Sequence, residues 1–214
     1  MKLGAIITGD IVNSTKLTVD ERELMLNTLQ MIPEVLSPIQ NVSIEIFRGD
    51  SFQLRIPNLG LALRCALAIR AWLRCHKIHK SKVLDARLAI GIGTLDYEAD
   101  SLSTSDGEAY RLSGRLLDSM NKSRLEIITP WYEVNDELKL LTAFADDIVS
   151  SWSQNQSKVI LLSLITLKNH VELSKELKIS RQMVDKSLKS SKKELIEAYI
   201  KQYEKLINKH LYQV

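Results

Sequence analysis

Two aspartates near the N-terminus occupy positions where a carboxylate can do chemistry. Asp10 follows a short apolar run in the sequence AIITGD, after which the chain turns polar. Asp50 lies at the tip of a predicted hairpin, because alternating segments at residues 43–47 and 51–56 flank it. Hard oxygen ligands suit Mg²⁺ and Mn²⁺. If the strands are neighbours, we expect the two carboxylates to hold such ions, two in a full site, together with the phosphates of a nucleotide.

The polar residues after Asp10 have two compatible interpretations. Asn13, Ser14 and Thr15 either cap the helix that follows or offer backbone amides to a phosphate at its N-terminus. Asp10 itself has an alternative as a turn aspartate that caps the same helix. A matched carboxylate in the hairpin favours metal or nucleotide binding over that alternative.

The elements expected to position these residues run in the order strand, helix, strand, strand, helix, strand. Apolar residues recur every three or four positions at 19–36, with a break or kink at the prolines, and again at 59–78. Residues 84–93 are apolar and partly alternating, which predicts the last strand. This order predicts an α/β (α+β) fold of the ferredoxin-like type, an antiparallel sheet with two helices on one face. The first strand then lies beside the hairpin, which brings the two aspartates to one edge.

A further helix is predicted at residues 107–120, after a loop rich in Ser, Asp and Thr, and a short strand at 125–129. Arg111 and Arg115 lie four positions apart on one face of this helix. Two guanidinium groups on one stripe can bind phosphate. The alternative is that they form ion pairs with nearby carboxylates on a solvated face.

Composition limits the class of protein. The 214 residues are 45% hydrophobic and 26% charged, as is typical of a soluble globular chain. No apolar segment approaches 18 residues and no leader pattern is present. We therefore expect no membrane partner and a cytoplasmic location, with Cys65 and Cys75 reduced.

Charge divides the chain unequally. Residues 1–156 carry 17 Lys and Arg against 20 Asp and Glu, whereas residues 157–214 carry 12 against 6. A basic tail on an acidic body indicates a division of labour, with the tail a candidate for binding nucleic acid. We predict three parts: a domain at 1–135, a connector at 136–156 and an all-helical domain at 157–214.

The tail has the apolar spacing of a helix-turn-helix. Its small core is predicted to contain Leu173, Leu177, Ile179, Val184 and Leu188. The second helix begins after Ser180 as N-cap, and the side chains expected to reach double-stranded DNA are Arg181, Gln182, Lys186 and Lys189. A charged helical bundle without DNA binding is the alternative. An apolar stripe at 195–207 is expected to pack on its own domain or on a second copy.

Several of these motifs together resemble the class III nucleotidyl cyclases. The resemblance rests on DIVNST from Asp10, RGDSF at 48–52, ARLAIGIG at 86–93 and the helix GEAYRLSGRLL at 107–117. The polymerase-like GGDEF domains share the hairpin arrangement. With its basic tail, the whole chain is similar to the SatD-like bacterial proteins, a cyclase-homology domain fused to a DNA-binding helix pair.

This resemblance implies roles for individual residues. Asp10 and Asp50 would be the metal carboxylates, and the backbone carbonyl of Ile11 an extra ligand. Arg48 and residues 13–15 would contact the nucleotide, a purine. Arg115 would be the transition-state arginine and Arg111 its catalytic neighbour, although active cyclases place an asparagine at the latter position. The family site forms between two subunits, so the resemblance also implies a homodimer.

Three hypotheses follow from the sequence. The leading one is a regulator whose cyclase-like domain binds a purine nucleotide with Mg²⁺ and modulates a DNA-binding tail. The second is an active metal-dependent nucleotidyl cyclase or nucleotidyltransferase whose tail only dimerises it. The third is a catalytically dead scaffold without ligand.

Overall fold

The computed structural model describes residues 2–78, 82–99 and 101–211. Within these residues, no helix combines the length and hydrophobicity needed to cross a membrane. Both cysteines are free, as expected.

Five strands form the main sheet, in the order β2-β3-β1-β6-β7. Their bounds are β1 Leu3–Ile11, β2 Ser43–Phe47, β3 Ser51–Ile56, β6 Ala86–Thr94 and β7 Leu125–Ile128. The pairs among the first four are antiparallel, which confirms the predicted ferredoxin-like strand order. The prediction of a purely antiparallel sheet was wrong, because β7 is parallel to β6. A crossover helix joins those two strands, and such a connection returns the chain in the same direction.

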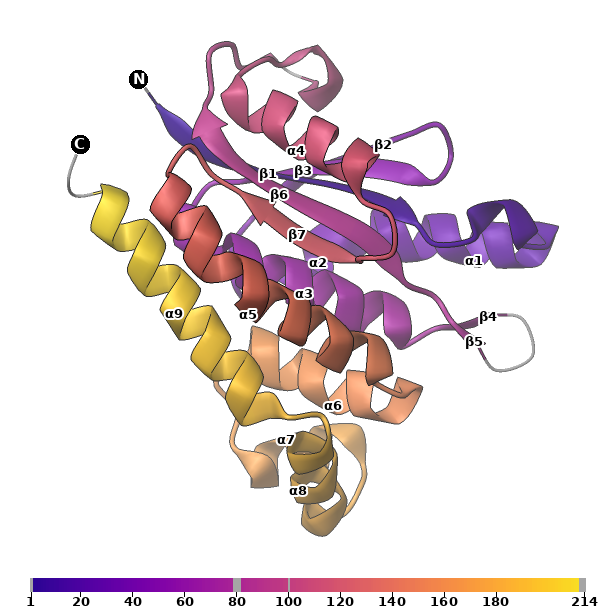
Figure 1. The fold of residues 1–214 in the computed structure, drawn as a ribbon. Helices are drawn as coiled ribbons and strands as arrows, with labels where there is room; N and C mark the ends of the chain where they lie inside the picture. The colour runs from indigo at the N-terminus through magenta and orange to yellow at the C-terminus, as the bar shows by residue number, and fades with distance from the viewer. Residues whose placement is uncertain (1, 79–81, 100, 212–214) are drawn as a thin grey trace.

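Helices cover both faces of the sheet (Figure 1). The bounds of the four that follow or separate the strands are α1 Val19–Gln30, α2 Ile32–Leu36, α3 Ala62–Arg74 and α4 Glu108–Ser119. The first three share one large core on one face, as predicted for the segments 19–36 and 59–78. The expected kink is the break at Met31, after which Pro33 lies in the first turn of α2. The crossover helix α4 packs on the opposite face.

Two segments differ from the predicted helix bounds. The helix expected at 59–78 is a short 3-10 turn, Leu59–Leu61, followed by α3, which ends at Arg74. Beyond it, β4 (Lys77–Ile78) pairs with β5 (Lys82–Val83) in a separate two-stranded sheet. Strand pairing replaces the predicted helix there, and Ile78 is buried in the main core.

Glycine lets α4 approach the sheet. A Cβ atom at Gly91 of β6 would lie 2.5 Å from the carbonyl oxygen of Ala109. Because no side chain fits in that space, the alternating IGIG sequence fixes the face on which α4 packs.

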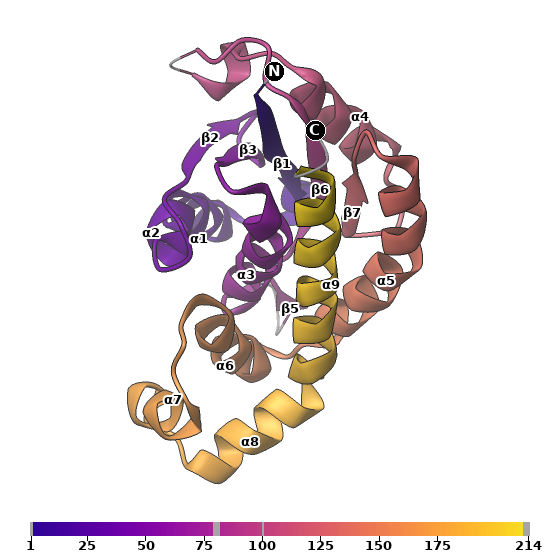
Figure 2. The ribbon, with the colours of Figure 1, turned by 90° about the vertical axis from the view of Figure 1, so that its left-hand side faces the viewer.

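The second half of the chain is helical. Its elements are α5 Tyr132–Ser151, α6 Gln154–Ile165, α7 His170–Leu177, α8 Arg181–Ser190 and α9 Lys193–Leu211. The predicted connector, 136–156, is therefore mostly helix α5. Figure 2 shows α7 and α8 at the end of the molecule away from α4, and α9 running back beside the sheet-containing part.

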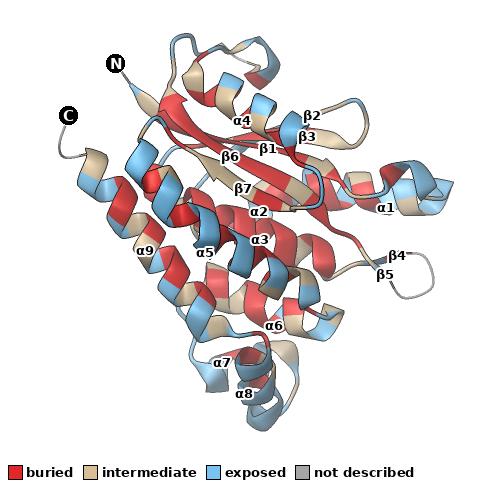
Figure 3. Cartoon of the chain, viewed as in Figure 1, coloured by how far each residue is buried: buried red, intermediate tan, exposed pale blue. Residues whose placement is uncertain are grey.

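One core joins the two halves (Figure 3). The hydroxyl of the fully buried Tyr203 on α9 donates to the carbonyl of Leu59 at 2.9 Å. Arg64 of α3 forms an ion pair with Glu197 of α9 at 3.0 Å. The apolar stripe at 195–207 thus packs mainly on its own chain, with Leu195 left exposed.

Candidate functional site

Strand pairing brings the two aspartates to the same edge of the sheet. In the antiparallel pair of β1 and β3, Asp10 lies opposite Ser51, the residue after Asp50. The backbone amide of Ile11 donates to the backbone carbonyl of Asp50 at 3.1 Å. The adjacency of strands on which the metal prediction depended is therefore present.

Asp10 is already paired. The neighbouring strand β6 places Arg87 opposite Asp10, and Arg87 Nε donates to Asp10 Oδ1 at 2.9 Å. A terminal nitrogen of the same guanidinium contacts the other oxygen of Asp10. Arg87 also donates to the Met120 carbonyl at 2.7 Å, and its hydrogen bond to Asp10 raises the pKa of Arg87. The sequence analysis missed this arginine, because its partner follows from strand register rather than from a local motif.

Asp50 is held by the loop after β1. Ser14, which is 6% exposed, donates its hydroxyl to Asp50 Oδ2 at 2.5 Å. Asn13 has a left-handed backbone (φ 59°) and its side chain is exposed, as is that of Thr15. The interpretation of residues 13–15 as helix caps was wrong. Thr18 caps α1 through a capping box with Glu21, and residues 14–16 form a short 3-10 turn between β1 and that helix.

The hairpin tip adds a cation to this edge. Arg48 is exposed and adopts φ 55°, and Gly49 follows with φ 80°. Two successive residues with positive φ make the tight turn that presents Asp50. Arg48 therefore borders the edge without entering it.

The oxygens at this edge do not fit a preformed two-metal centre. Both oxygens of Asp10 are engaged by Arg87, and Ser14 donates to Asp50. Nowhere in the described residues do three Asp, Glu, His or Cys side chains converge as a metal-ligand set. A divalent cation at this edge must compete with the guanidinium of Arg87.

The two predicted catalytic arginines lie on helix α4 and not on the strands that carry the aspartates. The N-terminus of α4 packs against Gly93, which pairs with Gly4 at the start of β1, whereas Asp10 is near its end. Arg111 forms ion pairs with Asp106 at 2.6 Å and with Asp96 at 3.1 Å. The expected pairing of Arg111 with the nearest helical carboxylates is therefore replaced by pairing with the preceding loop.

Arg115 is exposed and has no ion pair or hydrogen bond within the described residues. Together with Arg111 it borders a hollow of about 500 Å³. Within the described residues, neither arginine forms a hydrogen bond or an ion pair with Asp10 or Asp50.

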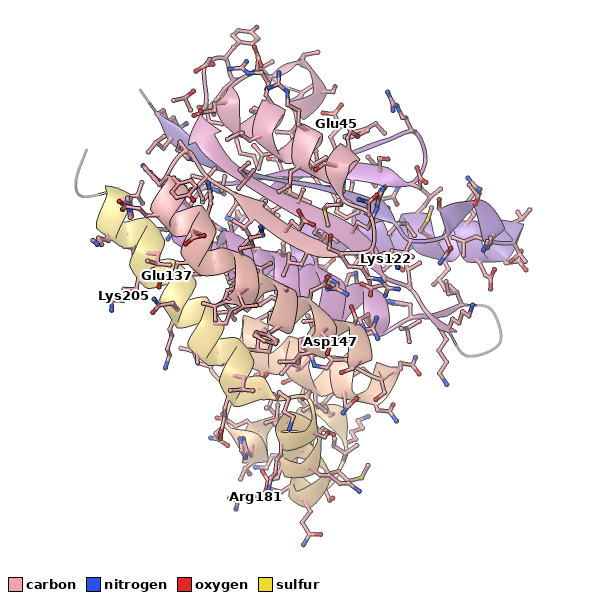
Figure 4. The ribbon with its side chains drawn as sticks, in the orientation of Figure 1. Glu45, Lys122, Glu137, Asp147, Arg181 and Lys205 are labelled. Atoms are coloured by element: carbon pink, nitrogen blue, oxygen red, sulfur yellow. The ribbon has the colours of Figure 1, made fainter. Side chains whose placement is uncertain are left out.

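A third carboxylate fastens the loop before α4. Glu45 of β2, labelled in Figure 4, accepts hydrogen bonds from the hydroxyls of Ser101 and Ser103 and from the Ser103 amide at 2.9 Å. These bonds, above all the one from the Ser103 hydroxyl, lower the pKa of Glu45 to about 2. The loop is thereby anchored across the edge strand of the sheet.

A buried cluster of arginines lies beneath the sheet edge. Asp85 is 3% exposed, and its Oδ2 accepts from Arg70 at 2.9 Å and from both Arg74 and Arg124 at 2.7 Å. Arg70 is fully buried and also forms an ion pair with Asp146 at 2.6 Å. The carbonyl of Asp85 accepts from the amide of Val12 at 3.0 Å, which ties the cluster to the loop after β1.

At the far end of the molecule, α7 and α8 pack through a small core of Leu173, Val184 and Leu188. The turn between them begins at Lys178, whose φ of 54° is the left-handed conformation that often recruits glycine. Ser180 caps α8 as predicted, accepting from the Met183 amide at 3.2 Å. The predicted DNA-contacting side chains are all exposed: Arg181, Gln182, Lys186 and Lys189. Figure 4 shows Arg181 at the opposite end of the molecule from Glu45.

Comparisons with known proteins find similarity among solved structures alone. No family model matches the chain, and no curated protein matches it. Among solved structures, the active GGEEF domain of a diguanylate cyclase from Vibrio cholerae is similar with 17% identity and a TM-score of 0.43. The match covers 60% of this chain and 83% of that domain. The interpretation of this chain therefore depends on its own motifs, strand order and site geometry.

Proposed function

We propose that this protein is a nucleotide-responsive DNA-binding regulator. The observation that supports the proposal is that α8 exposes Arg181, Lys186 and Lys189 on one side and buries Val184 and Leu188 against α7 on the other. A helix presented in this way suits the major groove of double-stranded DNA. The excess of 12 basic over 6 acidic residues in 157–214 supplies attraction to phosphates.

Two kinds of contact are expected from α8. Arg181 and Gln182 lie in its first turn, where a recognition helix meets base edges. Lys186 and Lys189 lie further along the exposed face and are assigned to backbone phosphates. The Asp185 carboxylate on the same helix lies 2.5 Å from Nδ1 of His170 on α7, a contact that supports the orientation of α8.

The sheet edge is the proposed nucleotide site. Asp10, Asp50, Arg48 and the loop at 13–15 surround it, and a purine nucleotide with Mg²⁺ is the expected ligand. The guanidinium of Arg87 is paired with both carboxylate oxygens of Asp10. Mg²⁺ binding at this edge therefore depends on release of that ion pair. A homodimer in the cytoplasm is the expected working form, in which Arg111 and Arg115 of one subunit would face the aspartates of the other.

The enzyme alternative keeps one supporting observation. Arg115 is exposed and unpartnered among the described residues, as a group poised to act across a subunit interface would be. An active nucleotidyl cyclase or nucleotidyltransferase would convert a purine nucleoside triphosphate with Mg²⁺ or Mn²⁺. Mixed dimers of Asp50→Ala and Arg115→Ala chains would then recover part of the activity. The Asp10 to Arg87 ion pair favours the opposite alternative, a catalytically dead scaffold.

A salt titration of DNA binding tests the regulator proposal. The full chain is used because α9 packs into the core of the sheet-containing half. Genomic fragments, including the region upstream of the protein's own gene, are titrated with protein at several salt concentrations. Arg181→Ala should weaken binding to a specific site about tenfold to a hundredfold and leave random DNA nearly unaffected.

Lys189→Ala should behave differently, because a phosphate contact carries no sequence information. It should weaken binding to all sequences alike and lower the salt slope by about one. Lys139→Ala, on the exposed face of α5, removes the same charge away from α8 and serves as control. Absence of DNA binding at about 50 mM salt would exclude the regulator proposal, because electrostatic attraction is strong there.

A further inference from the structure

A cavity of about 630 Å³ lies beside the proposed nucleotide edge and shares Asn13 with it. Its walls come from the loop after β1, the end of α3, the β4–β5 hairpin and the junction of α5 with α6. Neither Asp10 nor Asp50 lines it. This volume lies within the range of small-molecule sites.

The walls of the cavity are strongly basic. Lys16, Lys77, Lys82, Arg74 and Arg124 all line it, and Asp85 is the carboxylate among the described lining residues. The negative charge of Asp85 is already shared, because one of its oxygens accepts from three guanidinium groups. Among the described residues, the lining of the cavity therefore carries more positive than negative charge.

Arg74 places one of these positive charges in the interior of the protein. It is 5% exposed, yet its Nε is buried without a hydrogen-bond acceptor. Its other nitrogens donate to Asp85 and to the carbonyls of Ser150 at 2.8 Å and Trp152 at 2.6 Å. Burial, together with the nearby charges of Arg70 and Arg124, lowers the pKa of Arg74. An arginine under this electrostatic load is stabilised by an additional anion.

We propose that this cavity binds a small molecule carrying a phosphate group, which Arg124, Lys77 and Lys16 face together with the buried Arg74. Phosphate oxygens form charge-assisted hydrogen bonds with guanidinium and ammonium groups. Gln154 and Leu17, which also line the cavity, supply polar and apolar contacts to the rest of the ligand. The site does not depend on the nucleotide proposed at the sheet edge.

Such a ligand would join two parts of the chain. One wall belongs to the loop after β1, and the opposite wall includes residues 150 and 152–155, from which α6 leads to α7 and α8. Binding should therefore raise the melting temperature of the whole chain, because both walls are held only in the folded state.

Inorganic pyrophosphate is the probe for this proposal. Isothermal titration calorimetry on the full chain is performed without divalent cations, at an ionic strength matched with chloride. Lys77→Gln and Lys16→Gln remove exposed charges that line the cavity, so folding should be unaffected. Each should weaken pyrophosphate binding about tenfold, the value of one charge-assisted hydrogen bond.

Matched controls separate this site from general attraction and from the nucleotide edge. Lys205→Gln on α9 removes an exposed positive charge outside the cavity and should leave the affinity unchanged. Asp10→Asn should also leave it unchanged, even if the variant alters Mg²⁺-nucleotide binding. Absence of pyrophosphate binding to the wild type would overturn the proposal, as would equal weakening by Lys205→Gln.

Discussion

Two arginine–aspartate arrangements lie close together in this molecule and differ in depth. Asp85 is buried beneath three guanidinium groups, whereas Asp10 at the sheet edge has one partner, Arg87, with side-chain exposures of 22% and 30% for this pair. Both carboxylates accept two hydrogen bonds from one arginine in a forked geometry. The forked pairing is the same in both, but the number of arginine partners and the access to water differ.

Access to water decides what each arrangement can do. Exchanging a partner of Asp85 leaves a buried charge without compensation, which costs several kcal/mol. Asp10 can exchange Arg87 for water or for a cation at little cost, because solvent screens both groups. The interactions of Asp85 with its three arginines therefore stabilise the fold. The ion pair of Asp10 with Arg87 is suited to reversible exchange with a ligand.

The largest effect is expected at Asp85. Asp85→Asn should lower the free energy of unfolding by about 3–5 kcal/mol, because three guanidinium groups lose their shared anion. Chemical denaturation followed by circular dichroism measures this loss. Asp147→Asn makes the same change at an exposed position on α5, labelled in Figure 4, and should cost less than about 0.5 kcal/mol. Similar costs for the two variants would remove the distinction between buried and edge carboxylates.

Local patterns in the sequence were sufficient for most of the main elements. Alternation and turn residues located the hairpin that carries Asp50, and Ser180 as N-cap located the start of α8. Strand order then placed Asp50 beside β1, as the ferredoxin-like topology requires. These features depend on residues close together in the chain.

The missed features depend on register and on distant packing. Arg87 faces Asp10 because of a pairing across 77 positions, and Arg70 meets Asp146 across 76. In the sequence, Arg70 and Arg74 are polar residues interspersed in an apolar helix, and nothing local indicates that they are buried. They are buried because α5 and α6 pack over α3. The predicted connector likewise became α5, whose helical character was not recognised.

An intermediate effect is expected at Arg87. Arg87→Gln should change the free energy of unfolding by about 1 kcal/mol or less, because the ion pair is partly exposed. It should also raise the affinity of the edge for Mg²⁺ about tenfold or more, since a competing positive charge leaves Asp10. Calorimetric titration with MgCl₂ measures the second effect. Arg55→Gln, which breaks the ion pair with Glu98, serves as the control for loss of one arginine charge. An unchanged Mg²⁺ affinity would show that Arg87 does not guard a cation site.

The smallest effect is expected at Glu45, the carboxylate whose partners are hydroxyl and amide groups of a loop. Its pKa of about 2 lies below the ordinary 4.5, so its contribution is fully present above pH 4.5 and is lost as the pH falls toward 2. Carbon-detected NMR of the carboxyl group should therefore show a titration midpoint near 2.

In Glu45→Gln, amide exchange at Ser103 should become faster, because its backbone N–H loses a charged acceptor. The Leu95 amide, which donates to the Lys2 carbonyl at 2.9 Å, should exchange as before. A midpoint near 4.5 would mean that the loop is not held by this carboxylate, and the comparison of Asp85, Asp10 and Glu45 would lose its third member.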